Sequence, residues 1–295
     1  MAVGYLSREL RWVSGGAFEQ MNLVVFRVLM PCLLFYNIYA SPIEEVFDSG
    51  LIAYGVASVF VLFAACAFAA RALTADPAKR GVALQAMFRS NFLIYGLPIV
   101  QSLYGSRAGE TSLLISAIVP VFNGLAVVAL EMFRGGKVRA SSIAKNIATN
   151  PLIIATVLGL ACSAAGIRLP AIAENAMGSV AGAATPVALI VLGGTFRRQS
   201  LKQNLGLLIP VTAVRLVAAP GVFLAAAVAL GFRDVELLAL VTLFGSPVAV
   251  SSFSMAHQMG GDSEFAGQTV LLTTVASVFT IFMWVSAFNY LGLIR

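Results

Sequence analysis

The chain has 295 residues, of which 59% are hydrophobic and only 11% are charged, with a formal net charge of +6. A soluble domain of this length needs more charged residues to cover its surface, so much of the apolar surface must face lipid. This composition leaves no room for a separate soluble domain. The basic residues fall in short connections between apolar runs, which indicates membrane topology rather than nucleic-acid binding.

Nine apolar stretches follow one another, each near the roughly 20 residues that a helix needs to cross a hydrocarbon core of about 30 Å. We therefore expect an all-α integral membrane protein in which residues 1–295 form one transporter domain. The predicted helices are 20–39, 50–73, 82–104, 112–132, 147–166, 178–196, 206–230, 236–257 and 266–291.

The basic residues between these stretches predict the orientation of the chain. One set of alternate connections holds 12 of them: Arg8, Arg11, Arg71, Lys79, Arg80, Arg134, Lys137, Arg139, Lys145, Arg197, Arg198 and Lys202. The other set holds 4, namely Arg107, Arg168, Arg233 and Arg295, together with the acidic stretch 42–45. Because cytoplasmic loops are richer in Lys and Arg, we expect the N-terminus inside and the C-terminus outside a plasma or inner membrane.

Two short motifs indicate an internal repeat. Gly96-Leu97-Pro98 lies in the third stretch and Gly245-Ser246-Pro247 in the eighth, so the two motifs cross the membrane in opposite directions. A looser similarity links Pro31 with Pro186. We expect two inverted repeats, 1–132 and 147–295, each with one helix broken near its Gly-x-Pro. In a bilayer such breaks occur where the freed backbone groups line a cavity or are buried in protein.

The chain resembles the auxin efflux carrier family of permeases over almost its whole length. The best matching stretches are RSNFLIYGLPIVQSLYG (89–105), NPLIIATVLGL (150–160), ATPVALIVLGGTF (184–196), AVRLVAAP (213–220) and GSPVAV (245–250). The resemblance implies two inverted five-helix repeats whose fourth and ninth helices are broken and cross at the substrate site. The bile-acid sodium symporters are similar in fold. Because Gly4 to Arg8 matches the end of the family's first helix, we expect that helix to be missing here.

The resemblance also implies a function and a site. The family transports dicarboxylates such as malate, indole-type carboxylates and other organic acids, so the expected partners are a small organic anion and the lipid bilayer. At the position of Asn91, two helical turns before Pro98, the family's asparagine helps to recognise the substrate carboxylate. An interhelical hydrogen bond is the alternative role for this side chain. The predicted substrate-binding residues are Asn91, Gly96, Pro98, Gly245, Pro247, Asn123, Asn150 and Arg215; Ser252 and Thr273 are further cavity-lining candidates.

Three arginines fall within predicted helices: Arg27, Arg89 and Arg215. Because they lie in the cytoplasmic half of their spans, we expect their long side chains to reach the interface. Attraction of anions and pairing with Glu131 are the alternatives. The single histidine, His257, is expected to be an interfacial residue rather than a proton relay.

Other functions fit the sequence less well. The cysteines Cys32, Cys66 and Cys162 form neither a disulfide framework nor a metal motif, and one histidine is too few for a metallohydrolase. We therefore expect no enzyme, no metal and no cofactor. A sodium-coupled symporter of the bile-acid type and a channel or regulatory membrane protein remain alternatives, and a homodimer through the scaffold helices is left open.

Overall fold

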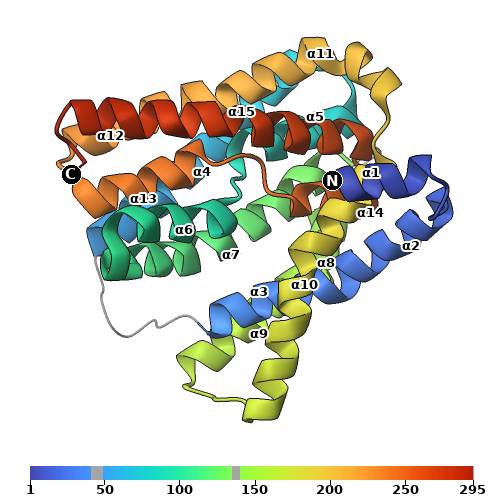
Figure 1. Cartoon of the computed structure of the whole chain (residues 1–295), viewed down its shortest axis with the longest axis horizontal. Helices are drawn as coiled ribbons and strands as arrows, with labels where there is room; N and C mark the ends of the chain where they lie inside the picture. The colour runs from blue at the N-terminus through green and yellow to red at the C-terminus, as the bar shows by residue number, and fades with distance from the viewer. Residues whose placement is uncertain (41–48, 135–139, 295) are drawn as a thin grey trace.

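The computed structural model describes residues 1–40, 49–134 and 140–294. The acidic stretch 42–45 and the basic residues Lys137, Arg139 and Arg295 lie outside these ranges. The described chain is almost entirely helical, and its β-pairing is one isolated bridge (Figure 1). This confirms the predicted all-α membrane protein.

Long continuous helices account for six of the predicted spans. They are α2–η1–α3 (Gly15–Val24, Val25–Leu29, Met30–Tyr39), α4 (Ser49–Leu73), α7 (Gly109–Met132), α10 (Ala171–Thr195), α11–η3–α12 (Arg198–Ala213, Val214–Ala218, Ala219–Ala229) and α15 (Ser263–Tyr290). Within the described residues, six helices are long and apolar enough to cross a membrane. A short helix, α1 (Ala2–Glu9), precedes them.

The remaining predicted spans are divided into shorter helices. The span 82–104 consists of α5 (Pro77–Phe88) and α6 (Phe92–Tyr104), and the span 236–257 consists of α13 (Asp234–Gly245) and α14 (Ser251–Met259). The span 147–166 is α9 (Pro151–Ala164), which follows the short helix α8 (Ala140–Ala148). A short 3-10 turn, η2 (Gly105–Ala108), joins α6 to α7.

The helices form two groups that are visible in Figure 1. Helices α2, α3, α9 and α10 gather at the lower right, where α3 packs against α9 and α10, and α1 packs against α10. The second group contains α4 to α7 and α11 to α15. Glycines permit the close packing of the first group: a Cβ on Gly4 would overlap the carbonyl of Ile190, and one on Gly194 would overlap the Phe18 ring.

Two helices contain a wider π-helical turn, η1 and η3. In each, a proline (Pro31 or Pro220) follows two residues after the π turn and has no backbone N–H to donate. The carbonyl of Leu216, four residues before Pro220, instead accepts a hydrogen bond from Trp284 Nε1 on α15 at 3.1 Å. A side chain from a neighbouring helix thus satisfies a backbone group that the proline has freed.

Candidate functional site

The two interrupted helices meet at their interruptions. Ser90 forms an antiparallel β-bridge with Val248, and the Asn91 N–H donates to the carbonyl of Pro247 at 2.8 Å. The Val248 N–H donates to Thr273 Oγ1 on α15 at 3.1 Å. Backbone groups that cannot form helical hydrogen bonds at the two breaks are therefore satisfied by each other and by α15.

The first break is not at the proline where we expected it. Residues 89–91 separate α5 from α6, whereas Pro98 lies inside α6. Proline removes a single donor and a helix can continue past it, but at Arg89 the backbone turns extended (φ −82°, ψ 122°) and leaves the helix. The second break does contain its proline: Pro247 follows Ser246, which is extended as residues before proline usually are.

Both helices that end at the crossing are capped by one arginine. Arg215, on η3, is completely buried (0% exposed). Its guanidinium donates to the carbonyl of Ser246 from Nε at 3.0 Å and from Nη2 at 2.9 Å, to Leu243 at 3.1 Å and to Phe88 at 3.2 Å. These carbonyls belong to the C-terminal ends of α13 and α5, which carry partial negative charge.

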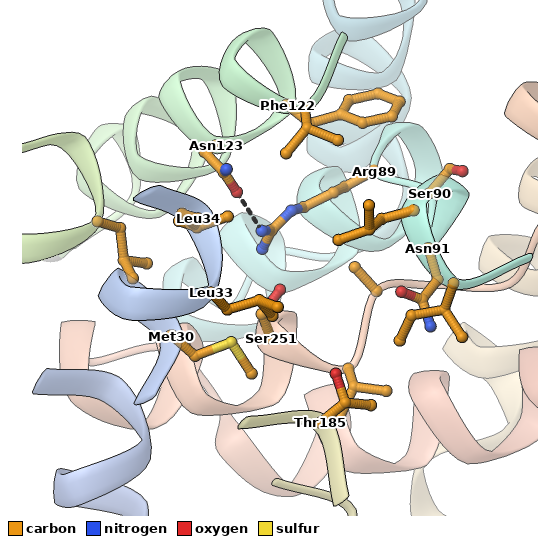
Figure 2. A pocket seen from close by; sticks show the side chains of 16 residues that line it. Met30, Leu33, Leu34, Arg89, Ser90, Asn91, Phe122, Asn123, Thr185 and Ser251 are labelled. Atoms are coloured by element: carbon orange, nitrogen blue, oxygen red, sulfur yellow. Dashed lines mark hydrogen bonds between the residues drawn. The ribbon is translucent and has the colours of Figure 1, made fainter. Parts of the chain in front are cut away.

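Both helices that begin at the crossing border a cavity. Helix α6 starts at Phe92 and α14 at Ser251, and neither has a side-chain cap. The cavity measures about 50 Å³, which on the scale of about 10–15 Å³ per water holds a few waters or one small carboxylate. Its polar side is formed by Arg89, Ser90, Asn91, Asn123, Thr185 and Ser251, and its apolar side includes Met30, Leu33 and Leu34 of α3 (Figure 2).

Arg89 provides the only charged side chain among the described residues that line this cavity. It is buried (4% exposed), and its guanidinium donates to Asn123 Oδ1 at 2.5 Å and to Met255 Sδ at 2.8 Å. Figure 2 shows the guanidinium extending from the break toward Asn123 on α7. In the described part of the chain, no carboxylate forms an ion pair with Arg89. Its positive charge is therefore left for a ligand to neutralise.

The structure gathers some of the predicted site residues and separates others. Asn91 and Asn123 line the cavity. The other predicted residues, Gly96, Pro98, Gly245, Pro247, Asn150 and Arg215, are not among its lining residues. Asn150 instead caps α9: its Oδ1 accepts from the Leu152 N–H at 2.9 Å, and its Nδ2 contacts Met259 Sδ at 3.7 Å.

Sequence reasoning did not assign Arg89, Ser90, Thr185 or Ser251 to the site. The available signal for Arg89 was its position two residues before Asn91. The predicted reach of Arg89 and Arg215 to the membrane interface is wrong, because both side chains are buried, whereas Arg27 is exposed. Glu131 pairs with none of the three; its carboxylate accepts from Arg134 Nη1 and from Asn146 Nδ2, each at 3.0 Å.

The other polar candidates lie outside the crossing cavity. The Ser252 hydroxyl is buried and has no partner among the described residues, whereas Thr273 accepts from Val248. His257 is half-buried, packs against the Phe253 ring and lines a second cavity of about 380 Å³ with Arg8, Glu19, Arg197 and Glu264. Its role as an interfacial residue stays a prediction. Among the described residues, no group of three or more His, Cys, Asp or Glu could hold a metal ion.

Long apolar helices and two broken helices that cross beside a buried cation define a multi-pass membrane transport protein. Comparison with known proteins leads to the same class. The chain belongs to the membrane transport protein family, whose model matches residues 1–285, which is the auxin efflux carrier family that its motifs predicted.

Two relatives match almost the full chain. A protein of Rhizobium meliloti (strain 1021) named "Putative malonate transporter" is 28% identical over 297 residues, covering 95% of this chain and 89% of the relative. A protein of Methanothermobacter thermautotrophicus named "Uncharacterized transporter" is 24% identical over 286 residues, covering 96% of this chain and 93% of the relative.

Proposed function

We propose that this protein is a secondary transporter of small organic anions that works by alternating access, with the substrate carboxylate held at the helix crossing. The observation that carries the proposal is Arg89, a buried guanidinium that faces a cavity and has no carboxylate partner in the described chain. The name of the Rhizobium relative makes malonate the first substrate to test.

The electrostatics of the crossing favour an anion. A buried charge without a counter-ion is costly, and a bound carboxylate would neutralise Arg89. The uncapped N-termini of α6 and α14 each add a partial positive charge of about half an elementary charge and unpaired N–H donors. Asn91 lines the cavity, and Asn123 Nδ2 has no partner among the described residues. These groups together provide donors for both oxygens of a carboxylate.

The position of the cavity suits a carrier. Its charged and amide groups come from the two broken helices and α7, while α3 and α9 close the opposite side with apolar residues. Under this proposal, the repeats 1–132 and 147–295 would move relative to each other and expose the site to alternate sides of the plasma or inner membrane. The excess of Lys and Arg in one set of loops supports that location.

Uptake and binding by purified protein test this function. Reconstituted protein should take up malonate, malate or indole-3-acetate in a saturable manner and should ignore malonamide, which has the shape of malonate without its charge. Arg89→Gln should weaken binding at least about 10-fold, because hydrogen bonds to charged groups contribute about 1.5–3 kcal/mol and about 1.4 kcal/mol is a factor of ten.

The exposed arginine Arg27 provides a matched control, since Arg27→Gln removes the same charge away from the cavity. This variant should bind the acids like the parent. The function is wrong if none of the three acids is taken up above empty liposomes. The assignment of the site is wrong if Arg89→Gln binds them with the parent's affinity.

A further inference from the structure

One buried side chain joins the two broken helices without touching the cavity. Arg215 is absent from the cavity lining, yet its guanidinium donates to three carbonyls at the ends of α5 and α13. In the described part of the chain it forms no ion pair with a carboxylate. Its charge is therefore offset by backbone carbonyls alone.

Those carbonyls explain why a cation is needed at this point. The last carbonyls of a helix have no partner within the helix and carry its partial negative charge. Here two such ends meet, with Phe88 closing α5 and Ser246 following α13. Without a cation between them, the two ends would repel each other and leave buried acceptors unpaired. A guanidinium satisfies both ends because its donors are arranged in a planar fork.

The helix that carries Arg215 is itself fixed in place. Arg215 lies in the π turn η3, and the adjacent residue Leu216 accepts from Trp284 through its carbonyl. The guanidinium thus starts from a backbone segment that is tied to α15. Since Val248 is also bonded to α15 through Thr273, the same long helix supports both the arginine and the break it contacts.

We propose that Arg215 is a positioning residue for substrate binding: as a shared C-terminal cap it sets the alignment of the two broken helices and so brings Arg89 and the N-termini of α6 and α14 to one cavity. This inference rests on the proposed function, but the alignment can be measured without a substrate. It also separates the roles of two buried arginines, of which Arg89 would contact the anion and Arg215 would not.

The bridge between Ser90 and Val248 offers a direct measure of alignment. Opposed residues of an antiparallel pair have Cα atoms about 4.5–5.5 Å apart, within the range of about 4.4–6.8 Å that a disulfide spans. In a background where Cys32, Cys66 and Cys162 are alanine, the pair Ser90→Cys/Val248→Cys should form a disulfide readily. Adding Arg215→Lys or Arg215→Met should slow its formation, because neither side chain can hold both helix ends.

Affinity for malonate provides the second readout. Arg215→Lys and Arg215→Met, without the cysteine pair, should bind malonate at least about 10-fold more weakly than the parent. In the cysteine pair, oxidation should restore most of the affinity lost through Arg215→Lys, and reduction should remove it again. Loss of stability alone would not predict a redox-dependent affinity. Arg27→Lys is the matched control and should change neither readout.

The outcomes separate the two proposals. A parent that binds no malonate counts against the proposed function, while the disulfide rate still tests Arg215. The positioning role is wrong if both Arg215 variants cross-link at the parent's rate, or if oxidation leaves their weakened malonate binding unchanged. Should Arg215→Met fail to fold, the Lys variant, which keeps the charge, decides between these results.

Discussion

Arg89 and Asn123 are joined by a hydrogen bond from Nη2 to Oδ1 of 2.5 Å, which fixes what the cavity offers to a ligand. Because the amide oxygen accepts from the guanidinium, the Nδ2 of Asn123 is the group left without a partner among the described residues. The pair therefore presents donors and positive charge, whereas an aspartate at position 123 would present an internal counter-ion.

Asn123→Asp should abolish anion binding while the protein stays folded. The new carboxylate would form an ion pair with Arg89 and repel a substrate carboxylate, so malonate affinity should fall well beyond the roughly 10-fold expected for one lost hydrogen bond. Isothermal titration of purified protein measures this. Asn175→Asp places the same charge at an exposed position of α10 and should bind like the parent. Unchanged affinity in Asn123→Asp would show that Arg89 does not contact the anion.

Asn91→Ala should weaken binding by roughly 10- to 150-fold, because it removes one amide donor to a charged group worth about 1.5–3 kcal/mol. The substitution keeps the backbone N–H that donates to Pro247, so the crossing should remain intact. Affinity and thermal stability should be measured on the same preparation. A variant that loses binding only together with its fold would indicate an interhelical role for Asn91.

Pro98→Ala and Pro247→Ala should have different effects although both belong to Gly-x-Pro motifs. Pro98 lies inside α6, so its replacement restores a helical donor and should leave uptake near the parent's level. Pro247 follows the extended residue Ser246, and alanine would allow α13 to continue through the break, so uptake should slow while expression is retained. Equal uptake rates for the two variants would contradict this distinction.

Gly194→Ala should destabilise the packing of α2 against α10. The added methyl would overlap the ring of Phe18, which is 1% exposed and cannot move aside freely. Overpacking of this kind costs about 1–3 kcal/mol. Gly182→Ala, on the same helix, meets nothing within 4 Å and should be neutral or stabilising. Thermal unfolding in detergent measures both, and equal stabilities would show that Phe18 adapts.

The fold was predictable where hydrophobic length carries the information. Stretches such as 50–73 and 112–132 coincide with α4 and α7 to within a few residues, because a membrane helix is specified by its apolar length. The breaks were less accessible. RSN at 89–91 contains no proline or glycine, and this segment leaves the helix because Val248 and Pro247, more than 150 residues away, supply its partners.

The site was only partly predictable for a related reason. Asn91 and Asn123 were identified as polar residues in apolar stretches, and both line the cavity. The three arginines, however, looked alike in the sequence, and only tertiary contacts distinguish them: Arg27 is exposed, Arg89 faces the cavity and Arg215 is covered by carbonyls. Such differences arise from partners distant in sequence, which local pattern cannot specify.

The crossing is held largely by main-chain atoms: the Asn91 N–H meets the Pro247 carbonyl, and Arg215 contacts carbonyls from two helices. Every residue type except proline offers the same N–H and carbonyl groups. Side chains that face the cavity, such as Ser90, Thr185 and Ser251, can therefore be exchanged without dismantling the crossing. For protein engineering, this makes substrate preference an adjustable property of the scaffold, because altering those three positions changes the cavity wall and leaves its framework in place.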